Sequence, residues 1–156
     1  MTLLKLATNY RTAINSAFEN KEFSKIPFSR FPKECCDLTC VLLAQFLEDN
    51  NFKTIQINGI HKDDHLWHHQ WLCLDESEIV VDITGDQFNQ YNFFEEDIPQ
   101  VHVGTEGKIH KLFCSERKTE CNTNFTDPSF FDTIDGRPNP RQQTLIDINN
   151  IISKYL

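Results

Sequence analysis

Apolar residues recur at intervals of three and four positions near both ends of the chain, which is the spacing of an amphipathic helix. Residues 3–18 carry a one-sided apolar stripe that predicts a helix of roughly five turns. Residues 33–50 predict a second helix, whose wider apolar surface indicates burial on most sides. Residues 141–156 predict a helix that closes the chain. One face of the second helix is formed by Cys36, Cys40, Leu43, Ala44 and Leu47.

Between these helices the pattern changes to short apolar runs bounded by polar turns, which predict strands. The predicted strands are residues 53–60, 69–74, 78–83, 101–103 and 109–114. Residues 23–32 predict an extended connector, and residues 61–68, 86–91 and 116–140 predict loops. The sequence shows no internal repeat and no domain boundary. We therefore predict one α+β domain, residues 1–156, in which the cysteine-bearing helix packs on an antiparallel sheet of about four or five strands and the terminal helices flank it.

Charge and composition exclude several classes of partner. The formal net charge of -8 argues against nonspecific binding to nucleic acids or anionic membranes. No run of eighteen apolar residues occurs, so no membrane span is expected. The first residues lack the basic and apolar regions of a signal peptide, which predicts a cytoplasmic protein or one exported without such a signal. The six cysteines include no C-x-x-C pair, and free thiols are expected rather than disulfides.

The candidate nucleophile is Cys36, at the predicted start of the second helix. Phe31-Pro32 precedes it and should stop any helix that runs in from upstream. A helix N terminus favours a thiolate, and its free N–H groups can hold the oxyanion of an acyl intermediate. Cys36 shares the packed face of the helix, whereas Cys35 is rotated from it by about 100°. The alternative is that both cysteines are small apolar filler residues.

The candidate base is His69, at the start of the second predicted strand. Four histidines crowd into this region: His61, His65, His68 and His69. The first three lie in the predicted loop, and His68 would point to the opposite face of the sheet from His69. Strand alternation puts His69 on the face of Trp71, and we predict that this face is turned toward the helix of Cys36.

The candidate orienting acid is Asp82, which follows three apolar residues in a strand that should be buried. A buried carboxylate needs a partner, because an unpaired buried charge is costly. If Asp82 and His69 are cross-strand neighbours, each supplies the partner that the other needs. The alternative is that Asp82 caps the turn at Ile83-Thr84-Gly85.

In this order, the motifs resemble the core of the transglutaminase-like and papain-like cysteine enzyme superfamily. The matching pieces are Cys36 with Leu43-Ala44, the strand ending in Asn58-Gly59, His69-x-Trp71 and Asp82-x-Thr84. They cover about residues 31–88. Gln70 replaces the alanine usual between the histidine and the tryptophan, and Cys35 replaces the glycine or tryptophan usual before the nucleophile.

The resemblance implies a Cys36–His69–Asp82 triad that performs thiol-dependent acyl chemistry on an amide or related carbonyl, with no cofactor. The superfamily contains peptidases, crosslinkers, deamidases, acyltransferases and noncatalytic relatives, so hydrolysis, deamidation and acyl transfer all stay open. The expected substrate is a protein, a peptide or a small amide. A small enzyme of this class also suits an exported effector or toxin.

Two other functions compete with this interpretation. A zinc centre could combine one of Cys35, Cys36 and Cys40 with one of His65, His68 and His69, although no ligand pair has the usual finger spacing. A noncatalytic binding module would instead use the acidic and aromatic residues 87–98 as a partner surface. The simpler explanation of residues 87–98 is a lid or edge segment whose phenylalanines pack on the core.

Overall fold

The computed structural model describes residues 1–131, 133 and 135–156, without the side chains at 115 and 116. Three long helices occupy the predicted places. They are α1 (Leu3–Glu19), α2 (Cys36–Asp49) and α4 (Pro140–Ile152). Thr2 caps α1, and Asn139 caps α4 through a reciprocal pair of hydrogen bonds with Gln142. Among the described residues, no helix has the length and apolar character needed to cross a membrane.

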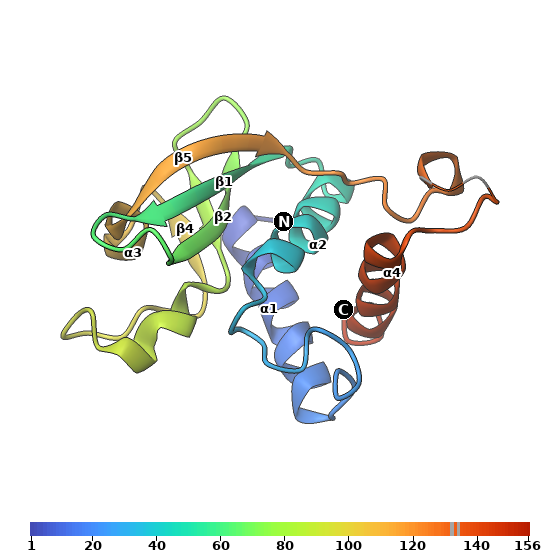
Figure 1. Cartoon of the computed structure of the whole chain (residues 1–156), viewed down its shortest axis with the longest axis horizontal. Helices are drawn as coiled ribbons and strands as arrows, with labels where there is room; N and C mark the ends of the chain where they lie inside the picture. Colours follow the sequence, from blue (N-terminus) through green and yellow to red (C-terminus); the bar gives the residue numbers. More distant parts are fainter. Residues whose placement is uncertain (132, 134) are drawn as a thin grey trace.

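Five strands of the described chain form one open antiparallel sheet in the order β4-β3-β2-β1-β5. The strands are β1 (Thr54–His61), β2 (His68–Leu74), β3 (Val80–Asp82), β4 (His102–Gly104) and β5 (Phe113–Glu120). The predicted α+β class is confirmed, as is a cysteine-bearing helix that packs on an antiparallel sheet with helices alongside (Figure 1).

Four local predictions were wrong. Residues 109–114 form most of a short helix, α3 (Lys108–Leu112), and the first two residues of β5. Residues 116–120, predicted as loop, complete β5, whose polar sequence fits an edge strand that pairs on one side only. Residues 86–91, also predicted as loop, belong to the 3-10 helix η1 (Gly85–Tyr91). The predicted extended connector is a series of turns that buries Phe23, Phe28 and Phe31.

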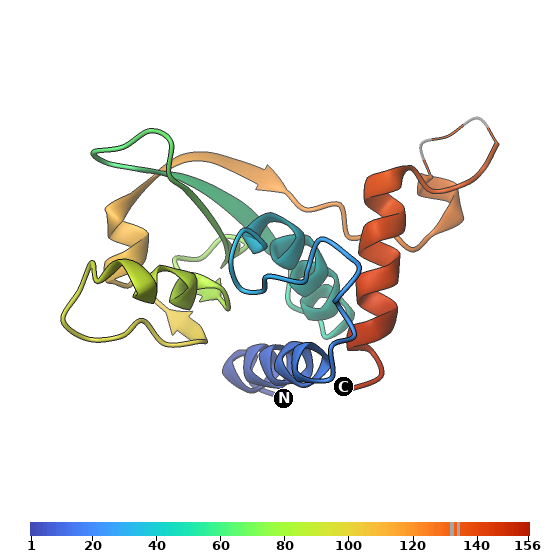
Figure 2. The same ribbon diagram turned by 60° about the horizontal axis from the view of Figure 1, so that its bottom comes forward.

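The sheet separates two apolar clusters, because successive side chains of a strand point to opposite faces. Leu72 and Val81 join the larger cluster with the three long helices, which lie on one side of the sheet (Figure 2). Trp71 and Val80 join the smaller cluster on the other side, where η1, α3 and the start of β5 cover them. Gly59 permits this packing, because a Cβ atom there would lie 2.8 Å from two ring carbons of Trp71.

Arg11 of α1 ties the first helix to the segment after β3. Its guanidinium makes two 2.8 Å hydrogen bonds to the Asp86 carboxylate and donates to the carbonyl oxygens of Ile83 (2.6 Å) and Gln100 (3.2 Å). The guanidinium also lies 4.7 Å from the centre of the Phe31 ring. The Arg11 side chain is 4% exposed, so the pair with Asp86 is almost wholly shielded from water. These contacts fix the chain where it leaves Asp82.

Candidate functional site

Cys36 is the first residue of α2, as predicted, and Cys35 is the N-cap. The Cys35 side chain makes no capping hydrogen bond, so it leaves the first N–H groups of the helix uncovered. Cys36 is partly exposed and lines a cleft, whereas Cys35 is fully buried. The Cys35 thiol lies 3.1 Å from the carbonyl oxygen of Lys33, and burial raises its pKa to about 12. Cys35 is therefore poorly suited to act as a nucleophile.

His69 and Asp82 form a buried pair: Nε2 of the ring lies 2.7 Å from Oδ2 of the carboxylate. The histidine is 0% exposed and the aspartate 3%. Leu72 pairs with Val81 in the β2–β3 register, so the next position outward sets Asp82 opposite Trp71. His69, two residues from Trp71 on the same face, is therefore a diagonal neighbour of Asp82 rather than its direct cross-strand partner.

Asp82 both pairs with His69 and caps the turn after β3, with one interaction on each carboxylate oxygen. Oδ2 accepts the hydrogen bond from His69, while Oδ1 accepts from the backbone N–H of Thr84 at 2.8 Å and from the Thr84 hydroxyl at 3.2 Å. Burial alone would raise the pKa of Asp82. The positive charge of His69 and the hydrogen bonds from His110 and His69 outweigh burial and hold that pKa far below its ordinary value. Asp82 is thus ionised at neutral pH.

A second histidine, His110 of α3, completes the hydrogen bonding of Asp82. Its Nε2 lies 3.0 Å from Oδ2, and its Nδ1 accepts the backbone N–H of Gly107 at 3.0 Å. Because Nδ1 accepts, the ring proton stands on Nε2, which donates to the carboxylate. Gly85 closes the other side: a Cβ atom there would lie 2.8 Å from Oδ2 of Asp82. His110 was not among the predicted site residues, because residues 109–114 were predicted as a strand.

With Nε2 of His69 held by Asp82, Nδ1 is the nitrogen left for chemistry. It makes no hydrogen bond of normal geometry among the described residues. Asp82 and Cys36 both act on this ring. Burial lowers the pKa of His69, but the charge and hydrogen bond of Asp82, followed by the nearby Cys36 side chain, outweigh it and raise the pKa to about 10. Cys36 is thus near the imidazole, while the described residues show no hydrogen bond of normal geometry between the two side chains.

We predicted that the sheet face carrying His69 is turned toward α2, and this was wrong for most of the helix. The His69 ring packs against Trp71, Phe88 and Phe113, on the face of the smaller cluster. The body of α2 covers the opposite face, together with Leu72. The predicted base therefore interacts with α2 through Cys36, in the first turn of the helix.

The predicted zinc ligands do not gather. Among the described residues, the group of three with metal-ligand geometry is His69, Asp82 and His110, whose ligand atoms lie within 4.8 Å of one another, and it contains no cysteine. Nε2 of each histidine already hydrogen-bonds to Oδ2 of Asp82, and the Gly107 N–H fixes the proton of His110 on Nε2, the atom that a metal ion would need. His65 is exposed on the β1–β2 connection, and His68 is exposed at the first position of β2.

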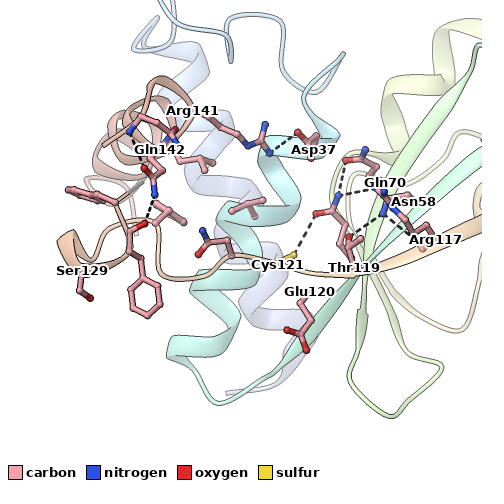
Figure 3. A pocket seen from close by; sticks show the side chains of 18 residues that line it. Asp37, Asn58, Gln70, Arg117, Thr119, Glu120, Cys121, Ser129, Arg141 and Gln142 are labelled. Atoms are coloured by element: carbon pink, nitrogen blue, oxygen red, sulfur yellow. Dashed lines mark hydrogen bonds and ion pairs between the residues drawn. The ribbon is translucent and has the colours of Figure 1, made fainter. Parts of the chain in front are cut away.

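Two hollows border the first turn of α2. A cleft of about 340 Å³ contains Cys36 and is walled by aromatic residues and by the basic turn before the helix. A cavity of about 730 Å³ lies on the other side and is mostly polar (Figure 3). Asp37, next to Cys36, and Gln70, next to His69, both line this cavity. Asp37 pairs there with Arg141 of α4 at 2.8 Å, and Gln70 accepts a hydrogen bond from Gln56 at 3.0 Å.

Comparisons with known proteins returned no match to a protein-family model, a curated protein or a solved structure.

Proposed function

We propose that this protein is a cysteine-dependent hydrolase or acyltransferase with a transglutaminase-like or papain-like core, and that Cys36, His69 and Asp82 act as its triad. The observation that carries the proposal is the direction of the hydrogen bonds. Both oxygens of the Asp82 carboxylate accept hydrogen bonds, and one of these bonds holds Nε2 of His69. Nδ1 is then the nitrogen that can exchange a proton with the Cys36 thiol.

In this mechanism the Cys36 thiol passes its proton to Nδ1 of His69, whose raised pKa favours the imidazolium form. The sulfur attacks the substrate carbonyl carbon, and the free N–H groups at the start of α2 receive the developing oxyanion. The tetrahedral intermediate then expels its amine, which takes the proton from Nδ1 of His69, and a thioester remains on Cys36.

Neutral His69 next removes a proton from the acceptor that attacks the thioester. Water as the acceptor releases a carboxylic acid, which corresponds to hydrolysis or deamidation. A primary amine as the acceptor forms a new amide. In both cases the second tetrahedral intermediate returns the sulfur as thiolate and the ring as imidazolium, and no cofactor enters the cycle.

The experiment is alkylation of Cys36 by iodoacetamide at pH 7, followed by site-resolved mass spectrometry. It is best done in a Cys114→Ser background, because Cys114 is exposed and would react on its own account. We expect Cys36 to react about tenfold or more faster than an ordinary thiol, which is only a few per cent thiolate at this pH. His69→Gln should remove that advantage.

Cys35→Ala serves as the matched control, because the thiol of Cys35 is buried and hydrogen-bonded to a carbonyl oxygen. It should leave the labelling of Cys36 unchanged. Slow labelling of Cys36 that His69→Gln does not alter would overturn the triad and favour a noncatalytic binding module.

The buried His69–Asp82–His110 group supports one competing function, a metal site. Metal analysis of the purified protein separates the two. A stoichiometric zinc ion that His110→Gln abolishes would replace the triad, because its binding would take Nε2 of His69 away from Asp82.

A further inference from the structure

An aromatic wall stands beside Cys36 in the 340 Å³ cleft. The rings of Trp67 and Tyr91 meet edge to face with centroids 4.6 Å apart, and Trp67 also stacks near Phe88 at 6.3 Å. Phe88 is buried and anchors the wall, whereas Tyr91 is 48% exposed. Leu66, exposed by 88%, extends the apolar surface at the rim.

The wall is held in place from behind. Phe93 packs against Trp67 at 5.3 Å and against Tyr91 at 5.8 Å. Each of these rings is packed against Phe93 and is partly open to water elsewhere. Because such rings are already held in place, they can bury a ligand ring at little cost in conformational entropy. A partly exposed tryptophan and an exposed tyrosine beside a candidate nucleophile therefore indicate a binding surface.

The turn before α2 supplies another part of the cleft lining through Arg30, Lys33 and Glu34. Arg30 pairs with Glu34 at 2.5 Å, which leaves Lys33 as the net positive charge of this turn. Lys33 makes no ion pair within the described residues, so its charge is available in a protein whose formal net charge is -8. A cavity of about 150 Å³ holds benzene. A cleft of about 340 Å³ thus has space for an aromatic side chain and the adjoining peptide.

We propose that this cleft selects a peptide substrate with an aromatic side chain beside the carbonyl that Cys36 attacks, and with an acidic side chain nearby that pairs with Lys33. This inference rests on the function proposed above. Trp67 and Tyr91 form the pocket for the ring, and Lys33 sets the preference for charge.

The test uses two peptidyl chloromethyl ketones that differ only in phenylalanine or alanine beside the ketone. Each alkylates a thiolate with loss of chloride, and the rate at Cys36 is followed by mass spectrometry in the Cys114→Ser protein. We expect the phenylalanyl probe to react about tenfold or more faster. Trp67→Ala and Tyr91→Ala should each reduce the ratio of the two rates. If only one of the two variants folds, that variant alone tests the aromatic pocket.

Phe18→Ala is the matched control, because Phe18 is an exposed aromatic residue on α1, 41% accessible and outside the cleft. It should leave the ratio unchanged. A second probe pair keeps phenylalanine beside the ketone and carries either glutamine or glutamate at the preceding position. The glutamate probe should label Cys36 faster than the glutamine probe, and Lys33→Gln should cancel that difference.

The outcomes separate the two proposals. Equal rates for the two probes, with iodoacetamide labelling still dependent on His69, would overturn the aromatic preference and leave the triad standing. Loss of the dependence on His69 would overturn both.

Discussion

Replacing Asp82 by asparagine tests the centre of the site with almost no change in shape. The carboxylate accepts four hydrogen bonds, from His69, His110 and, twice, Thr84. An amide has one oxygen and one NH₂ group. Either the two histidines or the two donors of Thr84 must then face the NH₂ group, which is itself a donor. His110 cannot turn its acceptor nitrogen toward the amide, because that nitrogen holds the Gly107 N–H.

The magnitude follows from burial. Removing one partner of a buried charged pair costs about 3 to 5 kcal/mol. With a urea dependence of about 2 kcal/mol/M, the unfolding midpoint of Asp82→Asn should fall by about 1.5 to 2.5 M. Asp63→Asn provides the matched control, because it makes the same change at an exposed position and should alter stability by less than about 0.5 kcal/mol.

The difference in stability between wild type and Asp82→Asn should also depend on pH. The pKa of His69 is raised from 6.5 to about 10 in the folded protein, so its contribution is complete below pH 6.5 and is lost as the pH rises through about 10. The pKa of Asp82 is lowered, so its contribution is present above its ordinary pKa and is lost only in strong acid. The stability difference should therefore be largest near pH 5 to 6 and should narrow toward pH 10.

The assay is urea unfolding of the three proteins, followed by tryptophan fluorescence at pH 5.5, 7.5 and 9.5. A difference that stays constant over this range would contradict the coupling of His69 to Asp82. Equal stability of wild type and Asp82→Asn at pH 5.5 would refute the whole account of the buried pair.

Three further substitutions test neighbouring contacts by the same unfolding assay. Gly59→Ala should cost about 1 to 3 kcal/mol, because the new methyl group would overlap the Trp71 ring; no loss of stability would contradict that close approach. Arg11→Lys should lower the free energy of unfolding by about 2 kcal/mol, because lysine cannot form the paired hydrogen bonds to Asp86. Equal stability would mean that these paired hydrogen bonds do not stabilise the fold. His110→Phe should cost about 1 to 3 kcal/mol through a lost donor, and a neutral result would mean that the carboxylate does not need it.

Much of the fold follows from local patterns in the sequence. The three long helices and the first three strands lie where periodicity predicts them, because each has a face buried in one of the two apolar clusters. The same pattern placed Cys36 at a helix start and Asp82 at a strand end. Whether these residues catalyse a reaction is a separate prediction that the alkylation experiment tests.

The missed elements lack such a signal. α3 is five residues long, too short to show helical periodicity, and β5 is an edge strand whose polar residues resemble a loop. His110 reaches Asp82 across 28 positions of sequence, a contact that no local pattern encodes. One clue was available: a carboxylate buried in a strand needs several donors, and a single histidine cannot supply them all.

The reach of Arg11 has a practical consequence for anyone who wishes to trim this protein. Residues 31–88 contain the thiol, the imidazole and the carboxylate, yet the chain leaving Asp82 is anchored by a guanidinium from position 11, and the carboxylate itself by a ring from position 110. A truncated version that keeps only the motif-bearing stretch would lose both supports. Shortened versions, split fusions and grafts should therefore retain everything from α1 to α3.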